Sequence, residues 1–212
     1  FKTYLSKTIA VDACVSPDNA EFAYAEVNNS GTTIQSNIKI ISIKDVKEKN
    51  TEPKYEYNAV QGSLVLRIKY QDKSRLICMY DDSIHKFETG VDVELTKLNE
   101  DNPKITFADI ELSNYVFRTY EKSTSLFRAD TIIEMQNTSN GKENVYTIEE
   151  VAKSVVSNNN VIAVNLGNEV YFVETNAWLI KRYSSSQVIE KIILGDGVAG
   201  IIYSDKIEIV NL

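Results

Sequence analysis

Three aspartates are the residues in this chain whose placement could support catalysis. Asp12 and Asp109 lie inside apolar runs, and Asp72 ends a third such run. Two carboxyl groups about 5 to 10 Å apart, one of them with a raised pKa, can hydrolyse a glycosidic bond. Sugar-binding clefts are usually lined with exposed aromatic side chains, but the only tryptophan, Trp178, lies in a segment that reads as an outer strand. We therefore expect solvated or turn-capping acids and keep a carbohydrate-active hydrolase as the alternative.

His85 is the only histidine of the chain. A single imidazole excludes a multi-histidine metal site, and any histidine-dependent triad would depend on this residue. Because it stands between Ile84 and Lys86 in a strand-like run, we expect a partly exposed strand residue.

Residues 195–200 read Gly-Asp-Gly-Val-Ala-Gly, the G-x-G-x-x-G pattern of a dinucleotide-phosphate loop. That chemistry requires a helix beginning at the third glycine, followed by a strand that ends in an acidic residue about 20 positions on. Residues 201–205 instead read as a strand and a turn. The pattern therefore predicts a turn between two strands and no bound cofactor.

Two acidic clusters and two cysteines complete the chemically interesting residues. Neither Asp81-Asp82 nor residues 100–102 (Glu-Asp-Asn) have the spacing of a calcium-binding loop. We therefore expect both acidic clusters to form turns. Cys14 and Cys78 both lie in apolar runs and lack C-x-x-C spacing, so buried free thiols are favoured over a disulfide or redox pair. No catalytic, cofactor-binding or metal-binding residue is predicted.

The composition is that of a soluble globular protein. The chain has 212 residues, 43% hydrophobic and 25% charged, with 23 basic and 30 acidic side chains and a net charge of -7. This charge argues against nucleic acid, which requires a clustered basic face. No apolar run approaches the ~18 to 20 residues that span a bilayer. Because the first residue is Phe1 and not methionine, we expect an upstream segment, which could hold a membrane anchor.

A hairpin pattern recurs along the chain. Residues 76–87, 162–173 and 199–210 can be aligned as two strand-like runs joined by a two-residue turn. The turn pairs are residue types that tight hairpins favour, namely Asp81-Asp82, Gly167-Asn168 and Ser204-Asp205. A hairpin that recurs at intervals of tens of residues indicates a repeat architecture.

Extending each hairpin by one strand on either side gives a four-stranded unit. Equivalent second strands at Phe22, Leu76, Val116 and Val161 match the ~40 to 50 residue period of propeller blades, the first interval being stretched by loops. The first strand of each unit is the most uniformly apolar, as expected if it is innermost and covered on both faces. The best helical candidate, residues 146–154, is assigned to strands.

The sequence therefore predicts an all-β, WD40-like β-propeller of about five four-stranded blades in a single domain, residues 1–212. The approximate blades are 9–60, 63–98, 104–149, 151–183 and 188–212. The last has three strands, and residues 1–6 could supply its fourth and close a five-bladed ring. Otherwise the chain is an open arc of a larger propeller.

A family resemblance supports this architecture. Residues 13–24 (ACVSPDNAEFAY) resemble the S-P-D-G turn signature of WD40-like and TolB-type propeller blades, with Asn19 in the usual glycine position. The chain also looks like the C-terminal part of an uncharacterised Gram-positive bacterial family, on the stretches 30–40, 68–72, 76–85, 178–183 and 202–212. The resemblance implies an upstream membrane anchor, further blades and an extracytoplasmic location, and it brings no catalytic motif.

The leading functional hypothesis is a noncatalytic protein-binding or scaffold module whose partner is another protein. Its candidate contact segments are the long loops 28–36, 43–53 and 137–142, which exceed what a strand connection needs. A structural domain that only spaces other segments is a third possibility.

Overall fold

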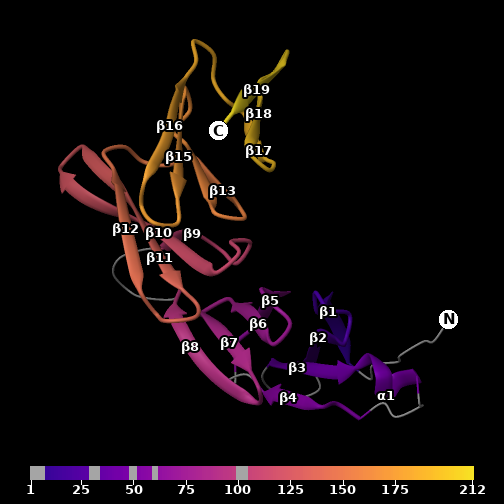
Figure 1. Cartoon of the computed structure of the whole chain (residues 1–212). Coiled ribbons are helices and arrows are strands. Elements are labelled where there is room, and N and C mark those ends of the chain that lie inside the picture. The colour runs from indigo at the N-terminus through magenta and orange to yellow at the C-terminus, as the bar shows by residue number, and fades with distance from the viewer. Residues whose placement is uncertain (1–7, 29–33, 48–51, 59–61, 99–104) are drawn as a thin grey trace. The chain divides into compact units, whose positions relative to one another are not determined.

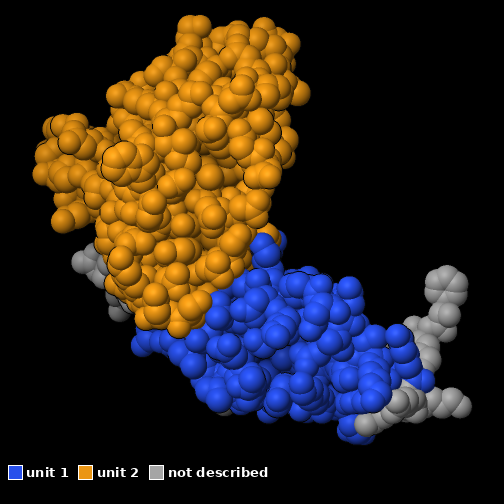
Figure 2. Space-filling model, in the orientation of Figure 1, with its two compact units in different colours: residues 1–99 blue, residues 100–212 orange. Residues whose placement is uncertain are grey.

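The computed structural model describes residues 8–28, 34–47, 52–58, 62–98 and 105–212. In these residues the chain forms five antiparallel sheets and one short helix (Figure 1). The chain divides into two compact units, residues 1–99 and 100–212, and each is described by itself (Figure 2). Residues 1–6, the proposed closing strand, and the acidic cluster at 100–102 lie outside the described residues.

The first unit contains two four-stranded sheets in which each strand pairs with the next along the chain. The first sheet consists of β1 (Ile9–Val15), β2 (Glu21–Asn28), β3 (Gln35–Ser42) and β4 (Tyr55–Asn58). Helix α1 (Ile43–Lys47) follows β3. The second sheet consists of β5 (Val65–Tyr70), β6 (Arg75–Tyr80), β7 (Ser83–Glu88) and β8 (Val91–Lys97).

The second unit contains three sheets with the same sequential order. One consists of β9 (Ile105–Asp109), β10 (Tyr115–Ser125), β11 (Arg128–Asn137) and β12 (Glu143–Ile148). The next consists of β13 (Ser154–Asn158), β14 (Val161–Asn165), β15 (Glu169–Glu174) and β16 (Leu179–Ser184). The last has three strands, β17 (Lys191–Leu194), β18 (Val198–Ile202) and β19 (Ile207–Asn211).

The three predicted hairpins are confirmed. Asp81-Asp82 joins β6 to β7, Gly167-Asn168 joins β14 to β15, and Ser204-Asp205 joins β18 to β19. The last two turns are closed by backbone hydrogen bonds between residues 166 and 169 (2.9 Å) and between residues 203 and 206 (2.9 Å). Residues 146–154 likewise contain the end of β12 and the start of β13, and no helix.

Each hydrophobic core lies between consecutive sheets. In the first unit β1 contacts β5, and in the second β9 contacts β13 and β13 contacts β17. One cluster, which includes Leu76 and Phe87, joins the two sheets of the first unit. Two further clusters, around Phe117 and Phe172, join the three sheets of the second unit.

The prediction that first strands are covered on both faces is wrong for β1. Ile9, Val11 and Val15 are exposed, whereas Asp12 and Cys14 point toward the second sheet and are partly buried. The reason is that the described residues place a neighbouring sheet against only one face of β1. An apolar run therefore indicated a strand here, but not which of its faces is covered.

Two buried hydroxyl groups fasten one sheet to the segment that leads into the next. Ser36 Oγ on β3 donates to Ser63 O (2.9 Å) and accepts from Val65 N (3.0 Å). Thr131 Oγ1 on β11 donates to Glu150 O (2.7 Å) and accepts from Ala152 N (2.8 Å). In both cases one hydroxyl binds a main-chain carbonyl and the N–H group two residues further on. The same arrangement therefore occurs in both units.

Candidate functional site

The turn between β1 and β2, which begins with Ser-Pro-Asp, contributes Asn19 and Ala20 to one wall of a pocket in the first unit. Ser16 Oγ donates to Asp18 Oδ1 (2.7 Å) and accepts from Glu21 N (2.9 Å), while Asp18 Oδ1 also accepts from Ala20 N (3.1 Å). The Ser16 hydroxyl, followed by the Ala20 N–H, lowers the pKa of Asp18. Asn19 has φ 56°, which confirms that it accepts the left-handed position usual for glycine.

The opposite wall is α1, in a region predicted to be a loop. Ser42 Oγ accepts a hydrogen bond from Asp45 N (3.3 Å), as an N-terminal cap does, and Ile43 N donates to Ala20 O (2.9 Å). The first turn of the helix is therefore tied to the β1–β2 turn. The remainder of the predicted contact loop 43–53 lies partly outside the described residues.

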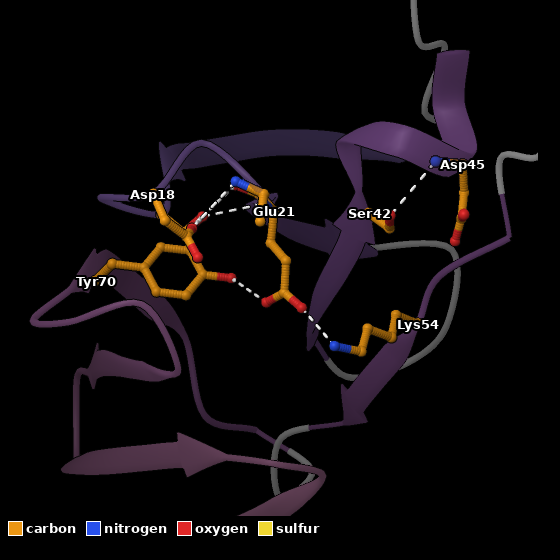
Figure 3. Close-up of polar contacts among 8 residues, drawn as sticks. Asp18, Glu21, Ser42, Asp45, Lys54 and Tyr70 are labelled. Atoms are coloured by element: carbon orange, nitrogen blue, oxygen red, sulfur yellow. Dashed lines mark hydrogen bonds and ion pairs between the residues drawn. The ribbon is translucent and has the colours of Figure 1, made fainter. Parts of the chain in front are cut away.

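The pocket has a volume of about 560 Å³ and a mixed-charge lining. Its lining residues are Asn19, Ala20, Glu21, Ser42, Ile43, Lys44, Asp45, Lys47 and Lys54. Figure 3 shows Glu21 between Lys54 and Tyr70. Glu21 Oε1 accepts from Lys54 Nζ (2.6 Å), and Glu21 Oε2 accepts from Tyr70 Oη (3.4 Å).

The contacts with Glu21 affect the pKa values of its two partners, Lys54 and Tyr70. The hydrogen bond to Glu21 raises the pKa of Lys54, with burial opposing it. Burial raises the pKa of Tyr70, and the nearby Glu21 carboxylate raises it further. Because both oxygens of Glu21 are engaged, the arrangement fits a site that binds polar groups better than one that transfers protons.

The three aspartates considered for glycoside hydrolysis all make structural hydrogen bonds. Asp12 Oδ2 accepts from Ile68 N on β5 (2.8 Å), and Asp109 Oδ2 accepts from Ser157 Oγ on β13 (3.1 Å). Both carboxylates thus link a first strand to that of the next sheet. Asp12 belongs to the first unit and Asp109 to the second.

Asp72 caps the turn between β5 and β6. Its Oδ1 accepts from Ser74 N (2.9 Å) and Arg75 N (2.8 Å). Burial alone would raise the pKa of Asp72, but these N–H groups and the Arg75 guanidinium lower it overall. The prediction of a turn-capping acid is therefore confirmed at this position.

His85 lies on β7 as predicted and connects two neighbouring groups. Its Nδ1 is 2.7 Å from Asp92 Oδ1, and its Nε2 is 3.1 Å from Ser83 Oγ. This is the order of atoms in a Ser-His-Asp triad. However, Ser83 is buried and its hydroxyl donates to Asp82 Oδ1 (2.8 Å), so that proton is directed away from the imidazole. The contacts suit a clamp between β7 and β8.

The other sequence motifs are part of turns and cores. Asp81 Oδ1 accepts from Leu64 N (2.7 Å) and Asp82 Oδ2 from Ser63 Oγ (2.6 Å). Residues 195–197 form the β17–β18 turn and Gly200 lies within β18, so the G-x-G-x-x-G pattern is a strand connection. Across the described ranges, no group of three or more His, Cys, Asp or Glu side chains is arranged to hold a metal ion.

Both cysteines are free, as predicted. Cys78 is buried and Cys14 is partly buried. Burial raises the pKa of Cys14 to about 12 and that of Cys78 further above its ordinary value. Neither thiol is therefore readily converted to the reactive thiolate.

The sequence reasoning missed the tip of the β10–β11 hairpin. Large apolar residues favour strands over tight turns, but Leu126 and Phe127 form the turn and are 88% and 96% exposed. Among the described residues, 121–130 have no flanking strand, because pairing with β9 ends at Tyr120 and pairing with β12 ends at Thr131. In Figure 1 this two-stranded ribbon projects from its sheet.

Comparisons with known proteins identify the fold but not a family. No protein-family model matches the chain, and no curated protein matches it. Solved structures do match. KlHsv2 with loop 6CD replaced by a Gly-Ser linker has a TM-score of 0.55 at 7% identity over 97% of this chain, and Sqt1 from Chaetomium thermophilum has 0.54 at 8% over 97%. These neighbours are β-propeller proteins. The chain shares their fold.

A third structure, from a study of two prolyl endopeptidases, has a TM-score of 0.58 at 15% identity over 95% of this chain. The chain spans 63% of the KlHsv2 chain, 59% of Sqt1 and 32% of the endopeptidase chain, so it covers less than two thirds of each. At these identities the similarity concerns architecture alone.

The described part of this chain contains no helix with the length and hydropathy of a membrane span.

Proposed function

We propose that this chain is a noncatalytic protein-binding or scaffold module. In this proposal its sheets are blades of a propeller, either a closed five-bladed ring or an arc of a larger one. Its parent protein is anchored in the membrane of a Gram-positive bacterium and presents the module outside the cell. The partner is another protein and not a nucleic acid, in keeping with the net charge of -7.

The observation that carries the proposal is the pair Leu126 and Phe127. Tight turns favour Gly, Asn and Asp, yet this turn places two large apolar side chains almost wholly in solvent. Neither side chain belongs to a described core cluster, so burial within the chain does not account for these two residues. An exposed aromatic anchor on a projecting ribbon is the kind of group that fills a pocket in a partner and carries binding energy.

The pocket between the Ser-Pro-Asp turn and α1 supports a second contact region in the first unit. Lys44, Lys47 and Lys54 lie in its lining beside Glu21 and Asp45. Such a lining suits a polar peptide segment of mixed charge. It also includes residues from the predicted contact loop 43–53.

The structural use of Asp12 and Asp109 supports the noncatalytic part of the proposal. Each carboxylate bonds to the next sheet, whereas a glycosidase needs one carboxyl free to donate a proton and a second free to act as base or nucleophile. A screen of the intact parent protein against common glycosides, with Asp12→Asn and Asp109→Asn as comparisons, should give no activity that depends on either residue.

Protein binding is tested by capture from cells that express the intact parent protein, followed by mass spectrometry. The double variant Leu126→Ser, Phe127→Ser is compared with Val91→Thr, Val93→Thr, which changes two exposed apolar residues on β8. We expect a partner retained by the wild type and the control but lost by the hairpin variant. With purified partner the hairpin variant should bind at least tenfold more weakly. Equal binding by all three proteins would contradict the assignment to this hairpin.

A further inference from the structure

A continuous chain of hydrogen bonds passes through His85 where β7 meets β8. His85 Nδ1 lies 2.7 Å from Asp92 Oδ1, and His85 Nε2 lies 3.1 Å from Ser83 Oγ. Ser83 Oγ donates to Asp82 Oδ1 (2.8 Å), and the other oxygen of that carboxylate accepts from Ser63 Oγ (2.6 Å). The chain therefore runs from a carboxylate on β8, through the imidazole and a buried hydroxyl, to a second carboxylate in the β6–β7 turn.

The directions of these hydrogen bonds specify the charge of the imidazole. A hydroxyl has one proton, and that of Ser83 goes to Asp82, because an ionised carboxylate can only accept. Ser83 Oγ can therefore only accept from His85 Nε2. The Asp92 carboxylate likewise can only accept, so the proton between it and Nδ1 belongs to the ring. Both ring nitrogens donate, and only the protonated imidazolium has two such donors.

Neither neutral form of the ring can keep every contact in this chain. If the remaining proton is on Nδ1, the Nε2 lone pair faces the Ser83 oxygen, and a hydrogen bond forms there only if Ser83 releases Asp82. If the proton is on Nε2, the Nδ1 lone pair faces the Asp92 carboxylate. The His85 side chain is 13% exposed, which limits the water that could take the place of a lost partner. Deprotonation therefore removes one hydrogen bond in either tautomer.

Titratable groups from several elements surround the ring. The Tyr80 ring lies 5.2 Å from that of His85, centre to centre, and Tyr57 packs on Phe87, the next inward-facing residue of β7. The full set consists of Tyr57 on β4, Cys78 and Tyr80 on β6, Asp82 in the turn, and Asp92, Glu94 and Lys97 on β8. Burial raises the pKa of Tyr57, Cys78 and Tyr80, so these three stay uncharged near neutral pH. Histidine is the residue type in this set whose charge ordinarily changes between about pH 5 and 8.

We propose that His85 is a proton-dependent clamp that holds β8 on the second sheet. β8 is the outer strand of that sheet, and most of its side chains are exposed, so few buried contacts retain it. The β7–β8 ladder is also irregular between Ile84 and His85, so the clamp lies where the pairing is interrupted. The protonated ring holds both Asp92 and Ser83, and the neutral ring releases one of them. β8 is therefore held more firmly below the titration range of the ring than above it.

Amide hydrogen exchange of the whole chain tests the clamp strand by strand. Protection is compared at about pH 5.5 and about pH 8, on either side of the histidine range, after correction for the intrinsic exchange rate at each pH. We expect the protection of β8 to fall roughly tenfold at the higher pH, which corresponds to one charge-assisted hydrogen bond. Two strands serve as internal controls and should keep their protection, namely β6 within the same sheet and β16, the outer strand of a sheet without histidine.

Variants separate the clamp from a general effect of charge. Asp92→Asn removes the carboxylate at one end of the clamp, and His85→Gln removes the titrating ring, so both should lose most of the change in β8 protection. Glu94→Gln is the matched control, because it removes a carboxylate of the same strand directly opposite His85 in the ladder, and it should keep the change. Far-UV circular dichroism shows whether each variant is folded, and the wild-type comparison needs no variant.

The clamp is overturned if the corrected protection of wild-type β8 is equal at the two pH values. It is also overturned if β6 or β16 loses as much protection as β8, because the effect would then not be local to the strand that His85 holds. A folded Asp92→Asn or His85→Gln variant that retains the full change, or a Glu94→Gln variant that loses it, would equally contradict the assignment to His85 and Asp92.

Discussion

Single polar side chains with two partners carry much of the specificity of this fold. Ser36 and Thr131 each satisfy one donor and one acceptor of the chain that leads into the following sheet. Asp12 and Asp109 link first strands in a similar way. Two of the three aspartates that suggested hydrolysis from the sequence are thus residues that connect adjacent sheets.

Removing one of these hydroxyl groups should destabilise the unit that contains it. Ser36→Ala leaves Ser63 C=O and Val65 N–H buried without that partner, at a cost of about 1 to 3 kcal/mol in the free energy of unfolding. Urea unfolding followed by circular dichroism measures the change. Ser123→Ala, at an exposed position on β10, is the control and should stay within about 0.5 kcal/mol of the wild type. Equal stabilities would show that water replaces the hydroxyl.

At the scale of the element, hairpins account for what could be predicted. Alternating apolar residues around Asp81-Asp82 or Gly167-Asn168 place strand, turn and register together, because a tight turn fixes which residues face each other. The predicted hairpins 76–87 and 162–173 lie within β6 to β7 and within β14 to β15. The residue types of such turn pairs therefore predict a hairpin without any knowledge of the rest of the fold.

Elements that depend on tertiary context were not predictable. Helix α1 is too short for an apolar periodicity and is held by Ser42 and Ala20. Leu126 and Phe127 have the composition of a strand and form a turn, so local propensity pointed the wrong way. The helix that lines the pocket and the tip of the β10–β11 hairpin form the candidate contact regions. Neither could therefore be predicted from the sequence alone.

The turn glycines give a prediction at this scale. Gly167 has φ 110°, far from the left-handed well near +57°, whereas Gly197 at φ 68° lies close to it. A side chain costs roughly 1 to 2 kcal/mol even in that well. We therefore expect Gly167→Ala to reduce the free energy of unfolding more than Gly197→Ala does. Thermal and urea unfolding of the two variants side by side measures this, and a greater loss for Gly197→Ala would contradict it.

At the scale of the whole molecule, the described cores divide with the two compact units. The cluster containing Phe87 belongs to residues 1–99, and those around Phe117 and Phe172 belong to residues 100–212. Each unit has its own buried apolar surface, which is the main favourable contribution to folding. Separate cores predict that the units unfold at different denaturant concentrations.

The two cysteines allow that prediction to be tested, because both lie in the first unit. Cys78 is buried in the Phe87 cluster and Cys14 packs against it. Burial holds the pKa of both thiols above the ordinary value, so at pH 8 they react with a disulfide reagent only when the first unit opens. Thiol labelling in urea therefore follows the first unit, whereas far-UV circular dichroism follows all five sheets. We expect the labelling midpoint to differ from the circular dichroism midpoint. Coincident midpoints would mean that the chain unfolds as one cooperative body, and rapid labelling of Cys78 without urea would contradict its burial.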